Sequence, residues 1–265
     1  MTLVYLFASY LALGALSGTL AGMFGIGGGL VIVPVLIFSF GLQGIGSEVA
    51  VHLAIGTTLA VIVFTAASSI RTHHQHRAVR WDIFWPMTAG IVVGALLGAK
   101  FAAMLSGRTL QLVIGVFVIL MAIKMLIGAN PKPGRDIPGR AGLAAVGGFI
   151  GWASAIFGIG GGSLTVPYLS WCNVRMQHTV GTSAACGLPI ALAGATGNIL
   201  TGWGAEGLPQ YSLGFIYIPA LLGIIATSVF FARFGARLAH RLDDKVLKRI
   251  FAMMLIVVGI RLLLS

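Results

Sequence analysis

The feature that most constrains this chain is a glycine-rich phrase that occurs twice inside strongly apolar sequence. The phrase Phe-Gly-Ile-Gly-Gly-Gly covers residues 24–29 and returns 133 positions later as residues 157–162. A proline follows each copy at the same distance, Pro34 and Pro167. Glycine disfavours a helix interior, so we expect each copy to interrupt a helix. In membrane proteins, interrupted apolar segments at matching positions of two halves indicate a substrate site.

Composition indicates that the chain lies in a membrane. Its 265 residues are 58% hydrophobic and only 9% charged, whereas a soluble domain carries about 25% charged residues. A helix needs about 20 apolar residues to span a bilayer. The sequence therefore predicts an all-α polytopic membrane protein, with apolar stretches at residues 3–23, 49–70, 83–103, 109–128, 141–157, 179–200, 213–232 and 247–264.

The net charge of +11 does not indicate nucleic-acid binding, because the basic residues fall between the apolar stretches. That pattern fixes the orientation of a membrane protein. Cys172 and Cys186 give neither a disulfide framework nor metal-ligand spacing. The histidines at 73, 74 and 76 lie in a basic loop, which we interpret as solvated. We expect no metal, no cofactor and no nucleic-acid partner.

The similarity between the two halves extends beyond the glycine phrase. Gly56-Thr57-Thr58 corresponds to Gly181-Thr182-Ser183, and a histidine precedes each triplet. This internal duplication predicts an N-terminal repeat at 1–128, a linker at 129–139 and a C-terminal repeat at 140–265, which form one integrated membrane domain.

Each repeat reads as five segments: a long helix, the glycine break, a short apolar stretch and three full spans. The short stretches cover residues 30–41 and 163–172. A helix of this length is too short for a hydrocarbon core of about 30 Å. Either a re-entrant arm or a short tilted crossing would fit the pattern.

Loop charge relates the two repeats. The loop at 71–80 contains three arginines, whereas its counterpart at 201–211 contains no Lys or Arg. The next pair is reversed, because residues 104–108 carry one Arg and residues 233–249 carry six basic residues. Basic loops face the cytoplasm, and an odd number of segments per repeat also requires inversion. We therefore predict inverted-topology repeats, a cytoplasmic linker and both termini outside.

The glycine breaks are the first candidate site. Unwound backbone is tolerated at membrane depth only inside protein or along a watery cavity. A helix that restarts after the break offers free N–H groups and a positive dipole end to an anion. The alternative is that the glycines only allow close helix packing. The candidate substrate-binding residues here are Gly25, Gly27, Gly28, Gly29, Gly158, Gly160, Gly161 and Gly162.

Polar side chains complete the candidate site. All six acidic residues lie at segment edges or in loops, which argues against a carboxylate-based cation transporter and against a hydrolase. His52 and His178 are proton-coupling candidates, because histidine titrates near neutral pH; the alternative is an interfacial histidine bonded to a neighbour. Other polar groups could bind an oxyanion, or could bond their own helix or a neighbouring one: Thr57, Thr58, Thr182, Ser183 and Asn198.

With its doubled motifs, the chain resembles the TauE/SafE (TSUP) family of sulfite and organosulfonate exporters. The resemblance rests on the segment Gly25–Gly29 with Pro34, on its second copy Gly158–Gly162 with Pro167, and on the two Gly-Thr triplets. The first triplet ends in Thr58 where the family usually has Ser. The resemblance covers nearly the whole chain and implies a bacterial inner-membrane protein that moves small sulfur-containing anions.

The sequence therefore predicts a secondary transporter rather than an enzyme. It would export sulfite or organosulfonates by alternating access around a midplane anion site. An anion channel with the same donors is the alternative. The expected partners are the lipid bilayer and a small anionic substrate. The exact substrate, the direction of transport, coupling to protons and a homodimeric state stay open.

Overall fold

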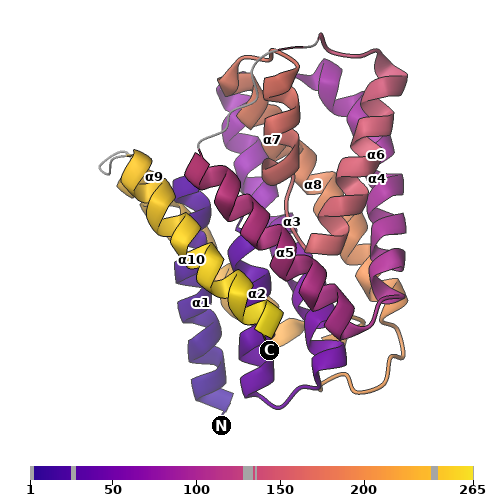
Figure 1. Ribbon diagram of the computed structural model, residues 1–265, viewed down its shortest axis with the longest axis vertical. Coiled ribbons are helices and arrows are strands. Elements are labelled where there is room, and N and C mark those ends of the chain that lie inside the picture. The colour runs from indigo at the N-terminus through magenta and orange to yellow at the C-terminus, as the bar shows by residue number, and fades with distance from the viewer. Residues whose placement is uncertain (1–2, 25–27, 128–133, 135, 240–243, 265) are drawn as a thin grey trace.

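The computed structural model describes residues 3–24, 28–127, 134, 136–239 and 244–264. Within these residues the chain is almost entirely helical (Figure 1). Five helices, α3 to α6 and α8, are long and apolar enough to span a membrane. The protein is an all-α polytopic membrane protein, as predicted. Its elements are α1 Leu3–Phe24, α2 Gly29–Leu42, α3 Ser47–Gln75, α4 Trp81–Ala103, α5 Gly107–Ile127, α6 Arg140–Phe157, α7 Gly162–Trp171, α8 Met176–Thr201, β1 Ser212–Leu213, β2 Ile216–Tyr217, α9 Ile218–Ala239 and α10 Asp244–Leu264.

The short helices α2 and α7 are returning arms of helical hairpins. Gln43, just after α2, donates its side-chain N–H to the Tyr10 hydroxyl at 2.8 Å, so α2 ends near the beginning of α1. In the second half, the N–H of Gly134 donates to the carbonyl oxygen of Trp171 at 3.2 Å. The end of α7 therefore lies near the start of α6. A short helix that folds back in this way fits the re-entrant arm, one of the two alternatives left open by the sequence.

Glycine in the left-handed region marks both hairpin turns. Gly158 has φ 62° and ends α6, because this conformation cannot continue a right-handed helix. Gly28 has φ 73° and stands directly before α2. The two positions are not equivalent in the repeat, since Gly161, the counterpart of Gly28, has φ −56°. Identical sequence thus adopts different backbone conformations in the two halves.

The helices of the two halves pack in equivalent pairs. α4 lies along α6, and its counterpart α9 lies along α1. α3 crosses α8 at the centre, and α5 packs against α10 (Figure 1). Small residues allow these helices to approach closely: Gly90, Gly94 and Gly98 of α4 face the backbone of α6 without room for a side chain.

A short hairpin, β1 and β2, replaces the start of one predicted span. The sequence predicted an apolar stretch from residue 213, whereas α9 begins at Ile218. Gly214 has φ 54°, which turns the chain, and Phe215 donates its N–H to the carbonyl oxygen of Asn198 at 3.1 Å. Apolar composition alone does not separate a buried strand from a helix.

Candidate functional site

The structure brings the two glycine breaks into direct contact. A Cβ atom on Gly29 would lie 2.6 Å from the carbonyl oxygen of Gly158 and 2.9 Å from the Cα of Ile159. A Cβ on Gly158 would lie 2.7 Å from the Val33 side chain and 3.2 Å from the Cα of Ile55. The breaks thus meet beside the middle of α3. Gly25 and Gly27 lie outside the described residues.

The second break presents the beginning of α7 to α8. A Cβ on Gly161 would lie 2.7 Å from the carbonyl oxygen of Ser183 and 3.1 Å from the backbone nitrogen of Gly187. No side chain caps α7 at Gly161. The first N–H groups of a helix have no partner within it, so Gly162 and the next residues offer their donors near the glycine turn that includes Gly160. α2 likewise begins without a side-chain cap at Gly28.

In the first Gly-Thr triplet the hydroxyls bond to backbone. Thr57 Oγ1 accepts a hydrogen bond from the N–H of Tyr217 at 2.9 Å. Thr58 Oγ1 donates to the carbonyl oxygen of Ala54, one turn earlier in α3, at 2.7 Å. Both side chains are 0% exposed. The structure therefore gives both hydroxyls a role in holding the fold.

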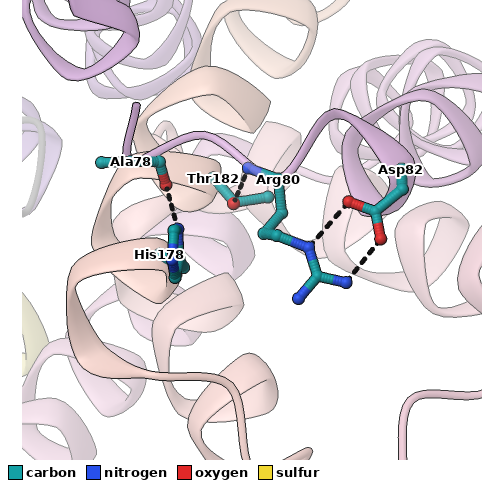
Figure 2. Close-up of polar contacts among 5 residues, drawn as sticks. All are labelled: Ala78, Arg80, Asp82, His178 and Thr182. Atoms are coloured by element: carbon teal, nitrogen blue, oxygen red, sulfur yellow. Dashed lines mark hydrogen bonds and ion pairs between the residues drawn. The ribbon is translucent and has the colours of Figure 1, made fainter. Parts of the chain in front are cut away.

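The second triplet meets the loop before α4 (Figure 2). Thr182 Oγ1 accepts a hydrogen bond from the N–H of Arg80 at 2.9 Å, and His178 Nδ1 lies 3.3 Å from the carbonyl oxygen of Ala78. The Arg80 side chain points away from this contact and pairs with Asp82, with Nε donating to Oδ1 at 2.8 Å. The Asp82 carboxylate raises the pKa of the Arg80 guanidinium, so the pair stays charged. His178 is thus anchored at one end of α8.

His52 is held at the start of α3. Its Nδ1 lies 2.8 Å from the carbonyl oxygen of Glu48, and its Nε2 lies 3.1 Å from the carbonyl oxygen of Ala102 at the end of α4. The ring is 7% exposed and lies 5.1 Å from the Phe215 ring. The Nε2 contact ties α3 to α4. These contacts place His52 at a helix junction rather than against the glycine breaks.

Asn198 also bonds within its own region. Its side-chain N–H donates to the carbonyl oxygen of Gly194 at 2.8 Å. A Cβ added to Gly56 would lie 3.1 Å from the Cβ of Asn198. The residue is 3% exposed. It sits where α3 crosses α8 beside the β hairpin.

Sequence reasoning missed three hydroxyls beside the second break. Ser154, Ser163 and Thr165 are buried and have no hydrogen-bond partner. The same is true of Ser183, which the sequence predicted as a site residue. All four lie on α6, α7 and α8, which contact one another. The prediction relied on residues that occur in both halves. Ser154, Ser163 and Thr165 have no hydroxyl counterpart in the first half. The sequence does show that a serine, Ser163, stands in the second half where the first half has Leu30, and this difference could have indicated the site.

A cavity of about 450 Å³ runs along α2, between α3, α5 and α10. Its walls are mostly apolar and include Pro34 and Phe38. Arg261 is the charged residue that lines it, and its guanidinium carbon lies 4.1 Å from the centre of the Phe38 ring. Gln111, also in the wall, donates to the carbonyl oxygen of Leu262 at 2.8 Å.

Comparison with known families decides what kind of protein this is. The sequence model of the family described as Sulfite exporter TauE/SafE matches residues 10–262. The chain belongs to the TauE/SafE family. The TauE/SafE match extends over both repeats and both glycine breaks, as the resemblance predicted.

Relatives of this TauE/SafE protein match over nearly their full length. A probable membrane transporter protein of Haemophilus influenzae is 36% identical over 256 residues, which cover 96% of this chain and 97% of the relative. A probable membrane transporter protein of Methanocaldococcus jannaschii is 28% identical and covers 95% of this chain and 93% of its own. YunE of Bacillus subtilis, similarly described, is 26% identical over 97% of both chains. No solved structure matches. The protein is a membrane transporter of the TauE/SafE family.

Proposed function

We propose that this transporter exports small sulfur-containing anions, such as sulfite or organosulfonates, by alternating access. The observation that carries the proposal is the contact between Gly29 and Gly158, which joins the two helix breaks in the protein interior. α2 begins at this contact, and α7 begins four residues after Gly158. Helix N-termini favour anions through free N–H groups and the helix dipole.

The distribution of charge supports an anionic substrate. Among the described residues the buried polar side chains include no Asp, Glu, Lys or Arg. A buried carboxylate, which would hold a metal cation, is therefore missing from this part of the chain. The hydroxyls and N–H groups at the breaks are hydrogen-bond donors, which suit an oxyanion.

The cavity along α2 supplies a route to this site. It extends from Ser47, near the start of α3, to Pro34, five positions after Gly29. Arg261 lines it, and a positive charge in a cleft raises the local concentration of anions. We propose that the cavity is the vestibule on the non-cytoplasmic side. Rocking of the two repeats about the glycine contact would close it and open the opposite side.

The experiment that tests this function is transport in proteoliposomes. Purified protein is reconstituted, and sulfite, taurine, methanesulfonate, sulfate and chloride are followed by mass or radiolabel, with and without a pH gradient. A carrier saturates and exchanges labelled for unlabelled substrate across the membrane. Flux that rises linearly with concentration and shows no exchange would identify an anion channel instead. A pH gradient that leaves the rate unchanged would exclude proton coupling.

A further inference from the structure

Four buried hydroxyls beside the second break have no hydrogen-bond partner. Ser154 and Thr165 are 0% exposed, Ser183 is 1% exposed and Ser163 is 8% exposed. None of the four oxygen atoms contacts another hydrogen-bonding group in the protein. Buried polar groups nearly always have a partner, because an unpaired one is destabilising. A set of four on adjacent helices therefore points to an occupant that accepts hydrogen bonds.

The other buried hydroxyls in the described helices, apart from Ser228, have a hydrogen-bond partner in the protein. Thr58 donates to Ala54 at 2.7 Å, and Ser17 donates to Gly14 at 3.3 Å. Three further unpaired hydroxyls, Thr88, Ser212 and Ser228, lie on α4, on β1 and on α9. The unpaired hydroxyls are thus concentrated where α6, α7 and α8 meet.

The beginning of α7 adds backbone donors at the same place. α7 has ten residues and no side-chain cap. The N–H of Thr165 donates to the carbonyl oxygen of Gly161 at 2.8 Å, so the N–H groups of Gly162, Ser163 and Leu164 have no acceptor within the helix. Ser163 belongs to this first turn, and Thr165 directly follows it. The positive end of the helix dipole therefore lies close to unpaired side-chain hydroxyls.

The first half does not offer these side-chain hydroxyls. At the same offset of 133, apolar residues Leu30 and Ile32 replace Ser163 and Thr165. The counterpart of Ser183 is Thr58, whose hydroxyl is already bonded to α3. The anion-binding capacity of the two inverted repeats is consequently unequal.

The charge of the occupant follows from what is buried. His52 is the only buried His, Lys, Arg, Asp or Glu among the described residues, and both of its ring nitrogens contact carbonyl oxygens. The hydroxyls and N–H groups at α7 are neutral donors. At equal radius, the solvation energy lost on burying a dianion is about four times that of a monoanion, because it scales with the square of the charge. Neutral donors alone therefore favour a monoanion.

We propose that the second break binds a monovalent oxyanion, a sulfonate or hydrogen sulfite, on the hydroxyls of Ser154, Ser163, Thr165 and Ser183 and the first N–H groups of α7. The first break supplies close backbone packing at Gly29. This inference rests on the proposed function and specifies its site and its substrate charge.

The test measures uptake of radiolabelled methanesulfonate into proteoliposomes. Unlabelled monoanions such as isethionate should compete at low concentration, whereas sulfate at the same ionic strength should not. Ser163→Ala, Thr165→Val and Ser183→Ala should each raise the apparent KM about tenfold, as expected for one hydrogen bond to a charged group. Without anion these variants should unfold at an unchanged or higher temperature, because the deleted hydroxyl had no partner.

Matched controls use unpaired hydroxyls away from the break. Ser228→Ala and Thr88→Val delete hydroxyls of the same kind on α9 and α4 and should leave the KM unchanged. Methanesulfonate uptake with a wild-type KM in all three α7 and α8 variants would overturn the site but leave the proposed function standing. Equal competition by sulfate would overturn the preference for a monoanion. If no sulfur-containing anion is transported at all, the proposed function fails and this inference fails with it.

Discussion

Thr57 on α3 accepts a hydrogen bond at 2.9 Å from the backbone N–H of Tyr217, the residue directly before α9. The other repeat has the same arrangement, since Thr182 on α8 accepts from the N–H of Arg80, directly before α4 (Figure 2). In both cases the triplet of one repeat holds the chain that enters a long helix of the other. The two repeats are therefore joined by reciprocal contacts on either side of the glycine breaks.

Replacing these threonines should destabilise the protein. Thr57→Val leaves the buried N–H of Tyr217 without an acceptor and should lower the free energy of unfolding by about 1–3 kcal/mol. Thr182→Val should cost less, because its contact is only partly buried. Thr57→Ser keeps the hydroxyl and should recover much of the loss. The measurement is thermal or denaturant unfolding in detergent.

A control for the threonine variants lies on α8. Thr201 donates to the carbonyl oxygen of Gly197 in its own helix at 2.8 Å, so Thr201→Val leaves no N–H unpaired. It should change stability by less than about 0.5 kcal/mol. Equal stability of the Val and Ser variants at position 57 would show that the hydroxyl does not hold Tyr217.

Even a methyl group at the second break should disturb transport. Gly161→Ala places a Cβ 2.7 Å from the Ser183 carbonyl oxygen, so α7 must move away from α8. We expect at least a tenfold loss of transport rate, about 1.4 kcal/mol or more, while the protein still inserts and purifies. Gly46→Ala is the control, because nothing lies within 4 Å of its Cβ and its φ is −56°. Wild-type transport by Gly161→Ala would show that the contact can relax without consequence.

The fold was largely predictable, because long apolar segments and glycine breaks are local properties of the sequence. In the part of the chain that the structure describes, the ten helices match the predicted segments, apart from the hairpin at Ser212–Tyr217, where an apolar strand was taken for a helix. The contact between Gly29 and Gly158 depends on how the hairpins pack, which sequence does not give. The hydroxyls of Ser163 and Thr165 were missed because the prediction relied on residues repeated in both halves, whereas the proposed site includes positions at which the halves differ.

At least one of His52 and His178 should govern any pH dependence of transport, because histidine side chains in general titrate near neutral pH. His52 Nδ1 faces the carbonyl oxygen of Glu48, and its Nε2 faces that of Ala102. Glu48 itself accepts from the N–H of Gly107 at 2.6 Å, which fixes the same junction. Transport rates against pH for His52→Gln, His178→Gln and the double variant provide the measurement. An unchanged pH profile in the double variant would remove histidine from the mechanism.

Both termini should lie on the non-cytoplasmic face. The inverted loop charges motivate this prediction, since the basic loops at 71–80 and 233–249 then face the cytoplasm with the linker. The first and last helices, α1 and α10, have their chain ends toward the same end of the molecule (Figure 1). Reporter fusions should report a cytoplasmic location at residue 136 and an outside location at the C-terminus. A cytoplasmic C-terminus would contradict the proposed orientation.

Arg261 should increase the affinity for substrate without taking part in the transport step. It lines the cavity along α2 and stacks on Phe38, so its charge acts on an anion that enters the vestibule. Arg261→Gln should raise the KM about three- to tenfold and leave kcat unchanged. The arginine attracts the anion equally before and during the transport step, so its removal weakens binding alone. The effect should shrink at high salt, because exposed charges are screened. Lys124, at the corresponding place on α5, does not line this cavity, so Lys124→Gln should keep the wild-type KM. A lower kcat with an unchanged KM in Arg261→Gln would instead assign the arginine to the conformational change between the two open states.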